Sequence, residues 1–166
     1  MRTSLLDSDT RREILAICRR EFEGIFAAAA NPPNIYGDDE AESRVDVTVI
    51  LDSSERRLSY EREICKGGAL SILAVDRQTF EKDVENDWLG GTLVDNLLVP
   101  YEPLINRGFL WSQEVKAKKR IIVETINNLI LEYPEMSREI LIKPEFFMWE
   151  AISRKASLYP PIICKI

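Results

Sequence analysis

The sequence predicts an α+β fold: a small sheet of mixed or antiparallel strands with an N-terminal helix packed on it, followed by a helical C-terminal half. Apolar and polar residues alternate along residues 45–52 and again along residues 57–65, as is typical of half-buried strands. Residues 69–75 are apolar on both faces, as expected for a central strand. Beyond residue 76 the apolar residues recur at helical spacing instead.

The first helix is predicted to begin at a capping box and to end near Ala30. Thr10 and Glu13 have the spacing of that box, and apolar residues then recur along one helical face. Asn31 and the two prolines after it must end the helix. Residues 34–44 carry acids and few apolar side chains, which predicts an acidic surface loop.

The two alternating runs are predicted to pair as a β-hairpin whose loop is residues 53–56. The core face of the first run holds Val45, Val47, Val49 and Leu51. Residues 66–68 then turn the chain into the central strand. Three strands in a meander, with the first helix packed on them, make up the predicted sheet.

Four helices and no further strand are predicted beyond the sheet. They span residues 79–87, 91–99, 112–133 and 144–158, with Ser112 as an N-cap and Pro144 in a first turn. The change from strands to helices predicts two units, an α+β domain over residues 1–87 and a helical extension over residues 88–166.

Composition and charge exclude several classes of function. The chain has 166 residues and no histidine, which removes Ser-His-Asp and Cys-His catalysis and histidine-based metal sites. A net charge of −6 argues against a protein that coats nucleic acid by bulk electrostatics. Because no apolar run is long enough to cross a bilayer and the first residues are too polar for a signal peptide, we expect a cytoplasmic protein with no membrane partner.

The predicted hairpin gathers acidic side chains on one face. A four-residue loop pairs Thr48 with Glu61 and Asp46 with Glu63, so that all three acids share that face. Like charges opposed across strands are destabilising, and the compensation is expected from Arg44, from open solvent or from a divalent cation. Two interpretations follow: the solvated face of a two-stranded ribbon, or a magnesium site.

The stretch from residue 27 to residue 75 resembles the nucleotidyltransferase family, that is, the DNA polymerase beta-type minimal nucleotidyltransferase superfamily. That family has a Gly-Ser, then Asp-x-Asp on a strand, then a third acid on the neighbouring strand; here Gly37 precedes Asp46-Val47-Thr48. The resemblance implies that acids hold Mg²⁺ ions, which bridge the phosphates of an NTP and activate an attacking hydroxyl. It thus implies Mg²⁺-dependent transfer of a nucleotidyl group to an unknown acceptor.

Matching positions assign the roles that the resemblance implies. The catalytic and metal-binding acids are Asp46, Glu61 and Glu63, and the nucleotide-binding positions are Gly37, Asp38 and Thr48. Two of these positions depart from the family pattern, because Asp38 replaces the serine and Thr48 replaces the second acid. Either Glu61 takes over the lost ligand, or the site is silent and the domain binds RNA or protein.

A basic run and an apolar terminus are two further candidate surfaces. The basic run consists of Lys116, Lys118, Lys119 and Arg120 on a predicted helix, where the side chains either bind RNA phosphates or form a solvated face. Residues 159–166 are apolar for a terminus, so they are expected to dock on their own domain or on a second copy in a homo-oligomer.

Overall fold

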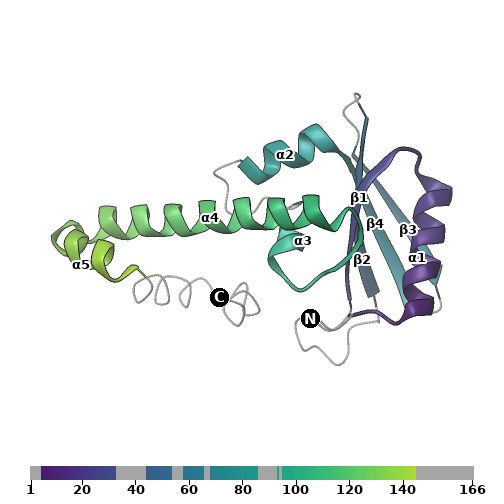
Figure 1. Ribbon diagram of the computed structural model, residues 1–166, viewed down its shortest axis with the longest axis horizontal. Helices are drawn as coiled ribbons and strands as arrows, with labels where there is room; N and C mark the ends of the chain where they lie inside the picture. Colours follow the sequence, from purple (N-terminus) through teal and green to yellow (C-terminus); the bar gives the residue numbers. More distant parts are fainter. Residues whose placement is uncertain are drawn as a thin grey trace.

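The computed structural model describes residues 5–32, 44–53, 58–65, 68–85, 93 and 95–144 (Figure 1). In chain order its elements are α1 (Ser8–Glu21), β1 (Ile25–Asn31), β2 (Arg44–Leu51), β3 (Leu58–Cys65), β4 (Gly68–Asp76), α2 (Arg77–Glu85), α3 (Asp95–Leu98), β5 (Glu102–Ile105), α4 (Arg107–Glu132), a 3-10 turn (Pro134–Met136) and α5 (Ser137–Ile142). The predicted α+β class, with a mixed sheet and helices in the C-terminal half, is confirmed.

The five strands form one sheet in the order β3-β4-β2-β1-β5. β2 and β4 are parallel, whereas the other neighbouring pairs are antiparallel. The predicted hairpin between residues 45–52 and 57–65 is therefore wrong, because β4 lies between β2 and β3. The reason is burial: β4 is apolar on both faces and takes an interior position beside β2, which leaves the charged β3 at the edge.

The first helix is shorter than predicted and begins earlier. Asp7, not Thr10, is the N-cap, and its carboxylate accepts hydrogen bonds from the backbone N–H groups of Asp9 and Thr10. The chain turns at Gly24, whose φ of +66° suits a residue without a Cβ, and residues 25–31 continue as β1 instead of a helix. Alanine favours helices, yet tertiary packing overrides that preference here.

Helices cover both faces of the sheet. Figure 1 shows α1 on one side and α2, α3 and the first half of α4 on the other. The alanines of β1 alternate between these layers, with Ala28 facing α1 and Ala29 facing α2 and α4, and all four of residues 27–30 are fully buried. Such small side chains let both layers approach β1 closely.

β5 is a strand that the sequence did not predict. It pairs with β1, so the sheet contains a strand from beyond residue 87 and the predicted division at that residue does not coincide with a limit of the sheet. Its four residues include Pro103, which hides the alternation on which strand prediction depends.

α4 begins at Arg107, five residues before the predicted N-cap Ser112. Asn106 caps it from a left-handed conformation with φ of 51°, and its side chain accepts a hydrogen bond from the N–H of Phe109 at 3.3 Å. The far half of α4 extends beyond the sheet in Figure 1, and α5 packs against it through a small cluster centred on Leu129 and Ile140. Within the described part of the chain, no helix has the length and apolar character that a bilayer crossing requires.

Cys18 is predicted to be chemically inert in the folded chain. Its thiol is fully buried between α1 and the sheet, and this desolvation raises its pKa from 9.0 to about 11. Because the folded pKa is raised, the contribution of the neutral thiol to stability is complete below pH 9 and is lost as the pH rises toward 11.

Iodoacetamide at about pH 8 should therefore leave Cys18 unmodified until denaturant unfolds the chain, as peptide mass spectrometry would measure. Alkylation of the native protein at the rate of a free thiol would contradict this placement.

Candidate functional site

The sheet separates the acids that the predicted hairpin brought together. Asp46 on β2 lies opposite Asn31 of β1 and Ser71 of β4. Glu61 on β3 lies opposite Ile72 of β4, which in turn pairs with Val47. Because opposed residues share a face and successive residues alternate, Glu61 is on the α1 side of the sheet and Asp46 is on the other side.

The remaining predicted positions do not restore a three-acid site. Glu63 pairs with Leu70, two positions along β3 from Glu61, and its side chain is not among those that the structure describes. Gly37 and Asp38 lie outside the described residues as well. Nowhere in the described ranges do three cysteine or carboxylate side chains gather closely enough to hold a metal ion.

Arg44 compensates the charge of Asp46, which was one of the three expected solutions. Its Nε lies 3.0 Å from Oδ1 of Asp46, and its Nη2 donates to Oδ2 at 3.3 Å. Both side chains are about half exposed, at 56% and 41%, so the pair contributes little to stability. The ion pair does give the Asp46 carboxylate a cationic partner within the chain.

Thr48, the second predicted ligand position on β2, is closed off by α3. The residue is 2% exposed, and its Oγ1 accepts a hydrogen bond from Nδ2 of Asn96 at 2.9 Å. Asn31 also fixes α3 over Thr48, because its Nδ2 donates to the carbonyl oxygens of Asn96 at 2.8 Å and Pro100 at 3.1 Å. Neither a nucleotide nor a hydrated metal ion reaches Thr48 in this arrangement.

The sheet row through Asp46 contains polar residues that the sequence-based interpretation missed. Asn31 ends β1, and its buried Oδ1 has no hydrogen-bond partner in the part of the chain that the structure describes. Ser71 on β4 donates from Oγ to the hydroxyl oxygen of Tyr60 at 2.8 Å. In the sequence, Asn31 and Ser71 stand out only because each is a polar residue within or at the end of an apolar run. Arg62 of β3 occupies the position opposite Ser71, so the row combines one acidic and one basic residue with two neutral ones.

The predicted basic run divides into two structural and two exposed cations. Lys118 donates from Nζ to Oε1 of the buried Glu114 at 2.6 Å. Arg120 donates from Nη1 to the carbonyl oxygens of Val84 at 2.6 Å and Asp83 at 3.3 Å, in the last turn of α2. Lys116 and Lys119 are exposed on α4.

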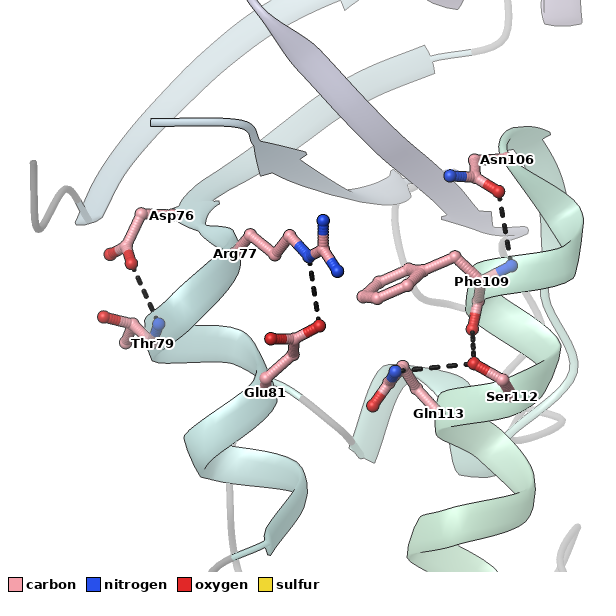
Figure 2. Close-up of polar contacts among 8 residues, drawn as sticks. All are labelled: Asp76, Arg77, Thr79, Glu81, Asn106, Phe109, Ser112 and Gln113. Carbon is pink, nitrogen blue, oxygen red and sulfur yellow. Dashed lines mark hydrogen bonds and ion pairs between the residues drawn. The ribbon is translucent and has the colours of Figure 1, made fainter. Parts of the chain in front are cut away.

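Two separate groups of polar contacts lie in the first turns of α2 and α4, and between them the Arg77 guanidinium points toward the Phe109 ring, 5.6 Å from its centroid (Figure 2). Asp76 caps α2 by accepting from the N–H of Thr79 at 2.9 Å, and Nε of Arg77 lies 3.0 Å from Oε1 of Glu81. The Arg77 guanidinium sits over the ring of Phe26, 4.3 Å from its centroid. These contacts tie α2 to the sheet, so they have a structural role.

Comparison with known proteins finds similarity among solved structures. No protein-family model matches the chain, and no curated protein matches it. The crystal structure of a nucleotidyltransferase-like protein from Exiguobacterium sibiricum is similar at 10% sequence identity with a TM-score of 0.49. The match covers 87% of this chain and 53% of the other, so this chain spans about half the length of that protein.

Proposed function

We propose that this chain is a catalytically silent, nucleotidyltransferase-like domain that works as a protein-interaction module. The observation that carries the proposal is the position of β4 between β2 and β3, which puts Asp46 and Glu61 on opposite faces of the sheet. In-line nucleotidyl transfer with two metal ions needs carboxylates that converge on one point. The burial of Thr48 and the cationic partner of Asp46 support the same conclusion.

Magnesium with an NTP is expected to leave the thermal stability of the chain unchanged. A bound ligand at a hundred times its dissociation constant would stabilise a protein by about 2.7 kcal/mol, which is readily measured as a rise in Tm. Substituting Asp46→Asn should change Tm by less than about 2 °C, because the ion pair with Arg44 is half exposed.

The same thermal measurement distinguishes a catalytically silent domain from an active transferase. Stabilisation by an NTP that requires Mg²⁺ and disappears in Asp46→Asn would overturn the proposal and restore the magnesium-dependent transferase. Glu81→Gln is a matched control, because Glu81 is a carboxylate of similar exposure on α2 that also forms an ion pair with arginine.

A protein partner fits the described surface better than RNA does. Only Lys116 and Lys119 of the basic run are exposed and outside the ion pairs and cap described above, on a chain of net charge −6. The far end of α4 and α5, by contrast, exposes large apolar side chains. These are Val123 (56%), Leu131 (79%), Met136 (38%), Leu141 (64%) and Ile142 (65%). Apolar surface of this kind marks interaction sites more often than nucleic-acid sites.

RNA binding is accordingly expected to be absent, and the double substitution Lys116→Ala/Lys119→Ala is expected to change nothing in a fluorescence titration with single-stranded RNA. Binding that falls with salt at a slope of about 0.7 per phosphate contact, and that is lost in this variant but retained in Lys82→Ala, would favour the RNA-binding alternative. Residues 159–166, for which a homo-oligomer contact was predicted, lie outside the described residues.

A further inference from the structure

The two edges of the sheet differ in how far they are closed. β5 is four residues long and contains Pro103, which has no N–H to offer to another strand. The beginning of the chain also covers it: Arg11 donates from Nη2 to the carbonyl oxygen of Pro103 at 3.2 Å, and the N–H of Leu5 donates to Oε2 of Glu102 at 3.1 Å. This edge is unsuited to further pairing.

The β3 edge is long and open within the described part of the chain. The strand has eight residues and pairs with β4 alone. On its α2-facing side Leu58 is 67% exposed and Tyr60 is 60% exposed, although the Tyr60 hydroxyl is anchored by Ser71. An edge strand of this length presents a row of unpaired backbone donors and acceptors beside two exposed apolar side chains.

We propose that β3 pairs antiparallel with β3 of a second copy, with the two-fold axis passing through Tyr60, so that two five-stranded sheets become one. A two-fold interface uses the same surface on both partners, and a strand edge is self-complementary in this sense. The pairing goes beyond the proposed function and involves neither Asp46 nor the end of α4.

The charge pattern of β3 selects this register. Because opposed side chains must share a face, the axis has to pass through a residue. An axis at Glu61 opposes the two Glu61 carboxylates, and an axis at Arg62 opposes the two arginines and also sets Glu61 against Glu63.

An axis at Tyr60 gives the longest overlap of β3 with itself that opposes no like charges. It sets Leu58 against Arg62 of the second copy, Ser59 against Glu61, and the two Tyr60 rings against each other. Ser59 Oγ is buried and has no hydrogen-bond partner among the described residues, and this register places a carboxylate-bearing residue in the position opposite Ser59. Aromatic cross-strand pairs are among the stabilising ones.

Sedimentation equilibrium of the whole chain tests the interface. The chain is expected to dimerise, and Tyr60→Lys should raise the dimer dissociation constant about tenfold or more, since it opposes two cations at the axis. Leu131→Lys, which alters an apolar residue of similar or greater exposure on α4, should leave the constant unchanged. A monomer at the highest soluble concentration, or a dimer lost with Leu131→Lys but kept with Tyr60→Lys, would refute the proposal.

A disulfide scan tests the register itself. In a Cys65→Ser/Cys164→Ser background, Tyr60→Cys should form an interchain disulfide on mild oxidation, because residues opposed at the axis have Cα atoms about 4.5–5.5 Å apart. Leu58→Cys is the matched control, since its two copies would lie about 13 Å apart along the strands. Linkage through Leu58→Cys alone would disprove the register, whereas neither outcome affects the magnesium and NTP experiment that tests the proposed function.

Discussion

Replacing Glu114 with alanine is expected to lower the free energy of unfolding by about 2–3 kcal/mol. Glu114 is 4% exposed, and its two carboxylate oxygens accept from the Tyr101 hydroxyl at 2.8 Å and from Lys118 Nζ at 2.6 Å. The substitution removes the acceptor of both donors. We set the expected value below that of a fully buried ion pair because Lys118 is 29% exposed and regains some water.

Urea unfolding followed by circular dichroism measures this change. Glu114→Gln should fall between the wild type and Glu114→Ala, because the amide oxygen still accepts from Tyr101 while the charge is lost. Glu132→Ala, an exposed glutamate on the same helix, is the control and should change stability by less than about 0.5 kcal/mol. A decrease of less than about 0.5 kcal/mol in the free energy of unfolding for Glu114→Ala would mean that the hydrogen bonds of Glu114 do not contribute to stability.

Arg120→Ala should cost about 1.5–3 kcal/mol, whereas Lys119→Ala next to it should cost almost nothing. The Arg120 guanidinium donates to Val84 and Asp83 carbonyl oxygens where α2 ends, and a cation at that position also interacts favourably with the helix dipole. Lys119 is exposed.

Hydrogen exchange is the more specific measurement of the Arg120 contacts. Loss of the cap should increase exchange in the last turn of α2 first, around residues 82–85, before global unfolding. Equal effects of Arg120→Ala and Lys119→Ala would contradict the division of the basic run into structural and exposed cations.

The alternation of apolar and polar residues predicted the positions of the strands better than it predicted which strands pair in the sheet. The alternation of residues 45–52 predicted the correct core face, with Val47 and Val49 buried beneath α1. The apolar run at residues 69–75 is an interior strand, although β2 and not β4 lies in the middle of the sheet. Pairing was wrong because neighbouring runs in sequence need not be neighbours in a sheet. The alternation of β3 fits an edge strand as well as it fits a hairpin partner.

Other errors arose where distant contacts outweigh local preference. The alanines before Asn31 have high helix propensity, yet they form the strand between β2 and β5, where both faces of the strand are buried under helices. The role of Arg44 beside Asp46 was predictable because two positions on one strand share a face. The cover over Thr48 was not, since it depends on Asn96, which is 48 residues away in the sequence.

The pairing of β1 with β5 constrains the order in which the molecule can assemble. Ala28 finds Ile105 as its partner, so β1 has only one neighbouring strand until synthesis has passed residue 105. In a nascent chain that ends before that point, the alanine backbone of β1 would form an unpaired sheet edge, and Leu110, which packs in the layer over β1, would be missing. Contacts this remote also slow folding. Residue 105 must therefore have been synthesised before β1 can gain its second neighbouring strand.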